Sequence, residues 1–417
     1  MRAENHAVTR EFLGLSIPSQ LSSAQRKSLV AGGLGWMLDA MDVMLYSMVL
    51  AELMTALGMS KATAGFLNSL TLFSSAAGGI LFGILADRIG RVRSLTASIL
   101  IYSVASGACG LSTTVTQLAI FRVILGLGMG GEWGTGAALI AETWPAQHRS
   151  KALALMQSMW AIGEMIAVGA TALILPRFGW RAVFFIGVLP ALVAMWIRRS
   201  VPEPELWLER AAKTHVPLKV LLRPDLRRNG LIATIMNAFA MFGYWGLFTW
   251  IPAYLSLPVE QGGRGLGLMA TTTWLLVMGV GKWFGYASYG VFADQFGRKR
   301  TYATYLFVAS LLVPLYGMTS SASALLALGP FVAFFGTGYF SGFGTIASEL
   351  FPTEVRASAM GISYNVGRVA AAAAPVIVGS LAGTYGLGSA FLLQAGAFLI
   401  AAVLSLALPE TKGKILD

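Results

Sequence analysis

The chain has 417 residues and a formal net charge of +11, and 56% of its residues are hydrophobic while only 12% are charged. Soluble domains carry about 25% charged residues. So few charges cannot cover a water-facing surface, which excludes an ordinary soluble protein and indicates that most of the surface faces lipid.

Apolar segments follow one another along the whole chain. A helix that spans a bilayer needs about 20 mostly apolar residues, and we count twelve such segments, six in each half. We therefore predict an all-α membrane protein with twelve transmembrane helices in two pseudo-symmetric six-helix bundles. The predicted spans are residues 28–50, 62–86, 94–112, 116–140, 151–175, 180–199, 228–255, 265–291, 300–318, 324–347, 357–381 and 387–408.

These helices divide the chain into five regions. We predict two bundles, of residues 28–200 and 228–408, joined by a polar loop of residues 201–227. The tails are residues 1–27 and 409–417. The apolar patch at residues 12–17 is too short for a signal-peptide core, so we expect the first tail to stay attached. In the central loop, residues 201–208 could start a short helix and residues 216–222 could lie on the inner membrane surface. The alternative is a plain connector.

Basic residues lie mainly in alternate loops. The two tails and the loops after each even-numbered helix hold 23 of the 30 Lys and Arg residues. The remaining loops hold Lys61, Arg177, Arg181 and Arg264. Because loops rich in Lys and Arg stay in the cytoplasm, we expect a multi-pass plasma (inner) membrane protein with both termini cytoplasmic. The positive charge is then a topology signal, and we expect no nucleic-acid partner.

Two sequence motifs occur once in each half at the same spacing. The first begins at Gly83 and again at Gly290, and 290 − 83 = 207. The second begins at Glu142 and again at Glu349, and 349 − 142 = 207. Two unrelated motifs that share one offset indicate a tandem duplication. A duplicated membrane bundle with charged loops at equivalent places is the architecture of a secondary transporter, whose substrate site lies between the repeats.

The fourth predicted helix is unusually rich in glycine, at positions 126, 128, 130, 131, 134 and 136. A dinucleotide-binding loop would need a preceding strand and a soluble α/β unit, and the sequence predicts neither. We expect instead that these small residues let neighbouring helices approach closely within the membrane.

The repeated Gly-x-x-x-Asp-Arg-x-Gly-Arg loop, Arg122 with the glycines after it, and the Glu-x-x-Pro…Arg loops resemble the signature of the major facilitator superfamily. The second copy of the first loop has Gln295 where the pattern has Arg. The resemblance covers residues 28–408 and implies two six-helix bundles around a central cavity, working by alternating access.

The same resemblance implies that the repeated loops help to hold one end of the transporter closed. We expect Gly83 to permit close helix approach and Asp87 to face a helix N-terminus, where negative charge is favoured. The predicted gating residues are Gly83, Asp87, Arg88, Arg91, Asp294, Arg298, Glu142, Arg149, Glu349 and Arg356.

Finer detail resembles the proton-coupled organic-acid branch, which includes sialate, lactate and aromatic-acid symporters. The segments that carry this resemblance are residues 36–42, 131–133, 180–190 and 364–367. The resemblance implies symport of a proton with an organic acid.

Seven ionisable residues stand well inside the predicted helices, where charge is costly and marks a candidate functional site. They are Asp39, Asp42, Arg122, Glu132, Glu164, Lys282 and Arg368. All four acids lie in the N-terminal half, and the positions 207 residues further on hold Gly246, Thr249, Tyr339 and Ala371. The loops are therefore symmetric while the buried charge is not. This indicates that one half carries protons and the other binds an anion.

Asp39 and Asp42 share one helix face, because they lie three residues apart. Two carboxylates in a poorly solvated cavity repel each other and burial penalises the charged form, so both effects favour proton binding. The alternative is a static ion pair with a buried base such as Arg122. Glu132 and Glu164 are rival proton sites, although Glu132 could instead pair with Arg122, which we otherwise expect to be a structural contact between helices.

Arg368 lies near the middle of its predicted span, and Tyr364 and Asn365 precede it by about one turn. A guanidinium presents paired donors that match a carboxylate, so we expect these three residues to bind the anion. The alternative is a salt bridge from Arg368 to the first or fifth helix. Lys282 is a second candidate anion contact, with a gate or a snorkelling side chain as the alternatives.

Polar and aromatic residues at helical spacing predict the walls of the site. Gln157, Trp160 and Glu164 fall on one face of the fifth predicted helix. Asn237 and Tyr244 do so on the seventh, and Trp36 shares a face with the two aspartates on the first. Such walls suit an organic acid with a flat or hydroxylated body; the alternative for each residue is an ordinary helix contact.

We therefore expect a proton-coupled symporter of a small organic anion, a monocarboxylate or related acid, which functions as a monomer without a metal or cofactor. The alternatives are a carrier of a neutral metabolite or drug, a transporter-like nutrient sensor and a membrane-embedded enzyme. The histidines, at positions 6, 148 and 215, fall in tails or loops, and Cys109 is the sole cysteine. The sequence therefore contains no metal-binding or hydrolytic motif and offers no intramolecular disulfide.

The distribution of basic residues predicts that the loop with residues 298–300 is cytoplasmic and that the loop with Arg264 is external. In a Cys109→Ser background, single cysteines near positions 262 and 299 can be tested in right-side-out vesicles. An impermeant thiol reagent should label the cysteine near 262 and spare the other. Labelling near 299 with none near 262 would overturn the predicted orientation.

Overall fold

The computed structural model describes residues 9–12, 15–18, 21–210, 223–351 and 356–412. These residues are almost entirely helical. The exception is a short antiparallel hairpin of β1 (Thr9–Phe12) and β2 (Leu15–Pro18), which lies before the first helix. The sequence analysis did not predict this hairpin, but it lies in the predicted tail, and the membrane part is all-α as expected.

The N-terminal half contains six long helices. Their bounds are α1 (Ser23–Leu57), α2 (Lys61–Ile89), α3 (Arg91–Gly110), α4 (Val115–Thr143), α5 (Ala146–Ile186) and α6 (Pro190–Ser200). The helix α5 is kinked at Gly179, whose φ of 72° is outside the helical range. The kink separates the fifth predicted span from the sixth, which begins in the last residues of α5 and continues in α6. A short helix, α7 (Glu205–Arg210), follows in the central loop, where the sequence suggested one.

In the C-terminal half, four of the six predicted spans are each divided into two helical pieces. The bounds are α8 (Pro224–Phe248), α9 (Ile251–Ser256), a 3₁₀ turn (Val259–Gln261), α10 (Leu268–Phe296), α11 (Arg298–Met318), α12 (Ala322–Gly338), α13 (Phe340–Leu350), α14 (Arg356–Ala371), α15 (Ala374–Tyr385), α16 (Leu387–Ala390) and α17 (Leu392–Leu406). Two of the breaks coincide with Pro252 and Pro375, which stand in the first turn of α9 and of α15. Proline has no N–H to continue the preceding helix.

Ten helical segments of the described chain are long and apolar enough to cross a membrane. One of them, residues 152–200, contains two predicted spans because it includes the kink at Gly179. The remaining predicted span is α10, a 29-residue helix that carries Lys282. The twelve-helix prediction is thus consistent with the structure.

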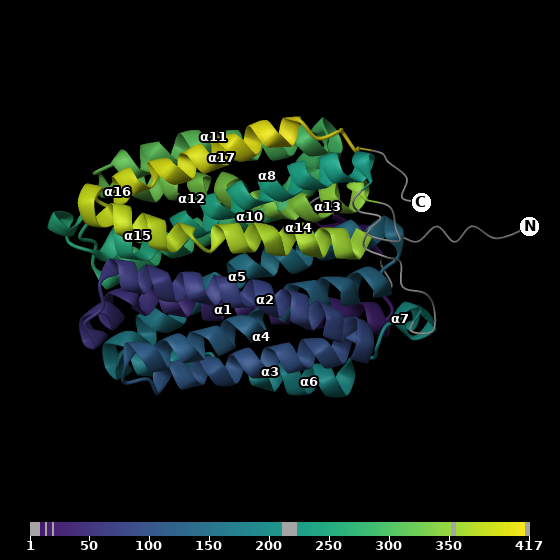
Figure 1. Ribbon diagram of the computed structural model, residues 1–417, viewed down its shortest axis with the longest axis horizontal. Coiled ribbons are helices and arrows are strands. Elements are labelled where there is room, and N and C mark those ends of the chain that lie inside the picture. The colour runs from purple at the N-terminus through teal and green to yellow at the C-terminus, as the bar shows by residue number, and fades with distance from the viewer. Residues whose placement is uncertain (1–8, 13–14, 19–20, 211–222, 352–355, 413–417) are drawn as a thin grey trace, which may run out of the picture.

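The two halves of the chain lie side by side, with α1 to α6 in one half and α8 to α17 in the other (Figure 1). Within the first half, α1 packs on α5, and α4 packs on α2 and α3. Within the second, α8 packs on α14 and α17, and α10 packs on α12. Between the halves, α5 packs against α10, and α2 packs against α14 and α15.

The glycines of α4 allow the close packing that their number predicted. A Cβ atom on Gly130 would collide with the backbone oxygen of Ser75 in α2. On Gly128 it would collide with the backbone of Tyr102 in α3. Only a residue without a side chain permits α4 to lie this close to both neighbours.

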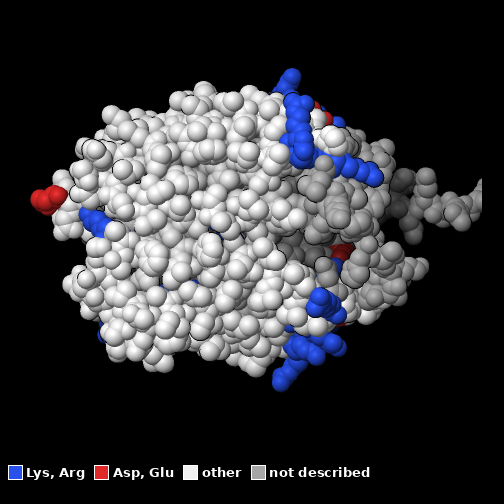
Figure 2. All heavy atoms as spheres, viewed as in Figure 1, with Lys and Arg blue, Asp and Glu red and all other residues white. Residues whose placement is uncertain are grey.

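Basic side chains gather at one end of the molecule, where the short helix α7 also lies (Figures 1 and 2). The beginning of α1 is near this end, since Trp144 Nε1 donates a hydrogen bond to the carbonyl of Gln25 at 3.1 Å. The segment after α17 is there as well, since Lys412 Nζ bonds the carbonyl of Gln295 at 3.0 Å. The separation of charge that the topology prediction requires is therefore present, and the orientation in the membrane stays a prediction.

The repeated loops contain the same ion pair twice. Arg91 forms a bidentate pair with Glu142, with a shortest N–O distance of 2.9 Å, and Arg298 Nε lies 3.5 Å from Glu349 Oε1. Arg298 is also paired with Asp294 one turn earlier. Arg88 is exposed, and the side chains of Asp87, Arg149 and Arg356 lie outside the described residues.

Gly83 does not lie at the close helix contact that we predicted for it. It is exposed, and a Cβ placed on it or on its counterpart Gly290 would have no atom within 4 Å. The two halves are instead packed together at the opposite end, where Gly65 lies against the backbone of Pro375 and Lys61 Nζ bonds the carbonyl of Gln261 at 3.1 Å. The prediction for Gly83 is therefore wrong for this conformation.

A third repeated feature was missed by the sequence analysis. The carboxylate of Glu203 accepts hydrogen bonds from the backbone N–H groups of Val92 and Arg93, at 3.1 and 3.2 Å. Glu410 accepts one from the N–H of Arg298 at 2.8 Å, and 410 − 203 = 207. Each acid caps a helix N-terminus, where negative charge is favourable. It thereby ties the segment that follows each bundle to a repeated loop.

Removal of the first of these caps should destabilise the protein. In Glu203→Ala, the N-terminus of α3 loses its acceptor, which typically lowers the free energy of unfolding by about 1 kcal/mol. Thermal unfolding of the detergent-purified variant can be compared with that of Glu205→Ala, which removes an exposed acid two residues away. Equal midpoints for the two variants would show that the cap does not contribute to stability.

Candidate functional site

Asp39 of α1 is fully buried between the halves. Neither of its carboxylate oxygens has a hydrogen-bond partner among the described residues. Three charges act on it: those of Arg368, from α14 in the other half, of Asp42 one turn along α1, and of Glu132 in α4. A carboxylate in such a position is stabilised by one buried cation and has no hydrogen bonds to hold its charge.

Asp42 has a different environment on the same helix. One of its oxygens accepts a hydrogen bond from the hydroxyl of Ser106 in α3, and the other has no partner in the described part of the chain. The positive charge that acts on it is that of Arg122. The guanidinium of Arg122 donates to Asn68 Oδ1 at 3.1 Å and lies 4.1 Å from the centre of the Tyr46 ring. Arg122 therefore connects α4 with α2 and α1.

Glu132 of α4 is the third buried acid in this region. It is 1% exposed, it forms no ion pair with Arg122 within the described residues, and the hydroxyl of Tyr102 is the polar group that faces it. Its carboxylate lies against Gly35 of α1, one turn before Asp39, and the two acids repel each other. The N-terminal half thus brings three sparsely bonded carboxylic acids together, as the sequence predicted for two of them.

Arg368 lies opposite these acids. It is 2% exposed, and its Nε atom has no hydrogen-bond partner in the described structure. Its guanidinium carbon is 5.5 Å from the centre of the Tyr364 ring. Tyr364 in turn stacks on Trp133 of α4, with ring centroids 4.2 Å apart and an interplanar angle of 8°. Trp133 Nε1 donates to Gln157 Oε1 of α5 at 3.2 Å.

Two of the three amides that we expected in the substrate site, Asn365 and Asn237, make helix contacts in this conformation. Asn365 Nδ2 donates to the carbonyl of Gly361 in its own helix, at 3.0 Å, and its oxygen faces Gly79 of α2. Asn237 of α8 donates to the carbonyl of Ser363 at 3.4 Å. For Asn237 this is the alternative of ordinary helix packing, and the Asn365 amide lies against its own helix and α2.

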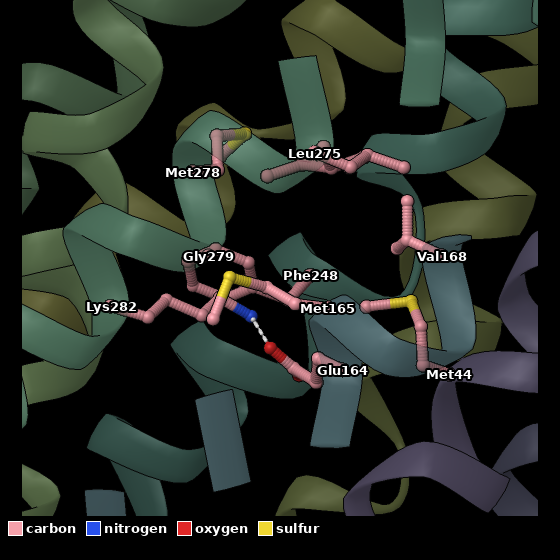
Figure 3. A pocket seen from close by; sticks show the side chains of 10 residues that line it. Met44, Glu164, Met165, Val168, Phe248, Leu275, Met278, Gly279 and Lys282 are labelled. Carbon is pink, nitrogen blue, oxygen red and sulfur yellow. Dashed lines mark hydrogen bonds and ion pairs between the residues drawn. The ribbon is translucent and has the colours of Figure 1, made fainter. Parts of the chain in front are cut away.

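Glu164 and Lys282 form an ion pair between the halves (Figure 3). Lys282 Nζ is 2.5 Å from Glu164 Oε2, and both side chains are buried. The other oxygen of Glu164 accepts from Trp160 Nε1 at 3.0 Å and from the hydroxyl of Tyr244 at 3.1 Å. Lys282 also lies 4.0 Å from the centre of the Phe248 ring. In this conformation Lys282 is therefore engaged by an acid and is not a free second contact for an anion.

A small cavity adjoins this ion pair (Figure 3). Its volume is about 20 Å³, and its lining includes Met44, Met165 and Met278. Such a volume holds about one water molecule. It is too small for an organic acid, so the substrate site is not this cavity.

Aromatic rings from α1, α5 and α8 pack together beside the ion pair, where Trp160 also bonds Glu164. Trp36 and Trp160 lie with ring centroids 4.5 Å apart at 46°, and Trp160 meets Trp245 edge to face at 6.3 Å. The Nε1 atom of Trp36 has no partner among the residues that the structure describes. The rings of Trp36 and Trp160 are thus in contact, and their role as walls of a substrate site stays a prediction.

The sequence model of the Major Facilitator Superfamily matches residues 33–289 and again residues 265–416. The chain belongs to this superfamily. It is therefore a membrane transporter and not an enzyme.

Curated relatives and solved structures agree with this assignment. The chain is 34% identical to a Cupriavidus pinatubonensis protein named "Probable 4-methylmuconolactone transporter", over 94% of this chain and 92% of that one. It is 32% identical to the sialic acid transporter NanX of Escherichia coli, over 91% and 93%. A structure of the E. coli xylose transporter XylE, in a partially occluded inward-open conformation, superimposes with a TM-score of 0.75. That structure is 21% identical, with 95% and 100% covered, and shows the shared fold.

Several residues of this facilitator's central region were not among our predicted site residues. Trp133 directly follows Glu132 in a segment that carried the family resemblance, so its position was a usable signal. Ser106 and Asn68 gave no such signal, because an isolated Ser or Asn in an apolar helix is common. Their contacts with Asp42 and Arg122 appear only once the helices are packed.

The buried ion pair predicts a specific pattern of stability. Lys282→Met leaves the Glu164 charge without its cation, which should lower the free energy of unfolding by about 3–5 kcal/mol. The double variant Lys282→Met, Glu164→Gln removes both charges and should regain most of that loss. Unfolding of the purified proteins in detergent measures both values. A double variant that is no more stable than Lys282→Met would contradict the account.

Proposed function

We propose that this facilitator imports a small organic anion together with protons. The observation that carries the proposal is Arg368, a buried cation that lies opposite Asp39 and whose Nε atom lacks a partner in the described structure. Support also comes from the named substrates of the two relatives, 4-methylmuconolactone and sialic acid, which are both carboxylic acids.

Arg368 has the properties of an anion contact. Its guanidinium can donate two parallel hydrogen bonds to a carboxylate. The nearby rings of Tyr364 and Trp133 provide an apolar surface for the body of the substrate. Trp36 and Trp160 extend that surface into the N-terminal half. We infer that the substrate carboxylate binds Arg368 and that its body lies among these rings.

Asp39 is our first candidate for the proton site, ahead of Asp42, Glu132 and Glu164. When Asp39 is charged, it neutralises Arg368 and competes with the substrate. When Asp39 takes up a proton, Arg368 loses its counter-charge and can bind the substrate carboxylate. Proton and anion are thereby bound together, which is the requirement for symport. Glu164 is the weaker candidate, because Lys282, Trp160 and Tyr244 already stabilise its charge.

Alternating access requires the end with the repeated loops to close when the other end opens. In the present conformation Gly83 and Gly290 have no neighbours within 4 Å of a Cβ position. We propose that these surfaces come together in the other conformation, where Asp87 and the paired arginines of both loops hold them. The protein would lie in the inner membrane as a monomer with both termini in the cytoplasm.

Loss of Arg368 should weaken anion binding. A charge-assisted hydrogen bond contributes about 1.5–3 kcal/mol, so Arg368→Gln should raise the dissociation constant roughly 10- to 150-fold. Arg368→Lys keeps the charge but loses the paired donors, and should be impaired less. Arg177→Gln, which removes an exposed basic residue, is the matched control.

Binding of carboxylates to the purified, folded variants is the appropriate measurement. An amide analogue of the substrate should bind the parent protein poorly and lose little more in Arg368→Gln. Unchanged carboxylate affinity in that variant would mean that the arginine is a structural or gating residue. The main reason for regarding the substrate as an anion would then be removed.

A further inference from the structure

Two aromatic rings from opposite halves of the protein lie face to face beside the proposed anion site. Trp133 comes from α4 and Tyr364 from α14, and their centroids are 4.2 Å apart at 8°. This pair is the most nearly parallel of the aromatic contacts in the described structure. Edge or tilted contacts are common in packed cores, whereas a parallel pair presents two flat faces to each other across the boundary between the bundles.

Both rings are held in position by neighbours of their own half. Trp133 Nε1 is fixed by Gln157 Oε1 at 3.2 Å, and both residues belong to the N-terminal half. The Tyr364 ring packs against Phe343 at 6.1 Å, within the C-terminal half. Each ring therefore moves with its own bundle. A change in the distance between the bundles changes the gap between the two faces.

The rings also have fixed relations to the charged groups. Tyr364 precedes Arg368 by one helical turn, and the guanidinium lies 5.5 Å from its ring centre. Trp133 directly follows Glu132 in the chain. An anion bound to Arg368 would thus have its non-ionic body next to the edge of this ring pair.

We propose that Trp133 and Tyr364 are specificity-determining residues, which part to accept the flat, conjugated portion of a carboxylate and stack on its two faces. The proposal rests on the proposed function, since it requires an anion at Arg368. In the absence of substrate, each ring covers one face of the other. A flat ligand replaces one stacking contact by two. A saturated ligand of the same charge cannot do so, because its puckered ring or twisted chain has no planar face.

A paired set of ligands separates shape from charge. Benzoate and cyclohexanecarboxylate carry the same carboxylate on a flat and on a puckered six-membered ring, and sorbate and hexanoate are the matching open-chain pair. Dissociation constants are measured for the full-length protein in detergent or nanodiscs. We expect the parent to bind the flat member of each pair roughly 2- to 12-fold more tightly, which is the range of a single aromatic contact.

Three variants then test the residues. Trp133→Leu removes one face and should abolish most of the preference, while affinity for the saturated acids changes little. Trp133→Phe keeps an aromatic face but loses the bond to Gln157, and should retain part of the preference. Arg368→Gln should weaken both members of each pair alike and leave their ratio unchanged.

The outcomes distinguish this inference from the proposed function. If the parent binds both acids of a pair and Trp133→Leu leaves their ratio as it is in the parent, the stacking role is refuted while the anion site stands. If the parent binds no carboxylate of either pair, the proposed function and the stacking role both fail. If the preference is lost in Trp133→Leu and partly kept in Trp133→Phe, the assignment is supported.

Discussion

Charge buried between the two halves is the constraint on which the rest of this structure depends. Burial of an ionised group is costly unless a partner compensates it. Glu164 and Lys282 compensate each other directly across the interface. Asp39 and Arg368 compensate each other only through space, with few hydrogen bonds in the described structure, and Glu132 faces the like charge of Asp39. Groups without a direct ion-pair partner change their charge or accept a ligand more easily. The Glu164–Lys282 pair therefore serves as a contact between the halves, whereas Asp39 and Arg368 can form a functional site.

The two halves are alike in their repeated loops but differ in their buried charges. The repeated loops give both halves the same ion pair and the same acidic cap, each 207 residues apart (298 − 91 and 410 − 203). In the proposed mechanism, these two similar bundles move against each other as rigid units. The four acids within the predicted membrane helices lie in the N-terminal bundle, and the two interface bases, Lys282 and Arg368, lie in the C-terminal one. Each movement between the bundles therefore changes the distance between groups of opposite charge. The same movement would part Trp133 from Tyr364, which links substrate shape to the conformational change.

The arrangement of twelve helices in two bundles could be predicted from the sequence, because it depends on local patterns. The length of the apolar spans, the common offset of the motifs and the glycines of α4 each indicate how one helix forms or packs. The predicted partners were less accurate, because they depend on which faces meet. Nothing in the sequence showed that Glu164 faces Lys282, or that Asn365 turns toward Gly79. The prediction for Gly83 was wrong because the loop motif does not show which end of the transporter is closed in this conformation. Glu203 was missed because a Pro-Glu dipeptide in a polar loop is too short a pattern to identify its partner.

The most direct test of the central claim compares two transport modes of Asp39→Asn in proteoliposomes. The amide keeps the shape of the side chain and cannot take up a proton at this position. Parent protein should accumulate a labelled carboxylate, chosen from a small panel, when a pH gradient is imposed. The Asp39→Asn variant should lose this accumulation yet still exchange labelled for unlabelled substrate. Normal gradient-driven accumulation by Asp39→Asn, and likewise by Asp42→Asn, would contradict the account and move the proton site to Glu132 or Glu164.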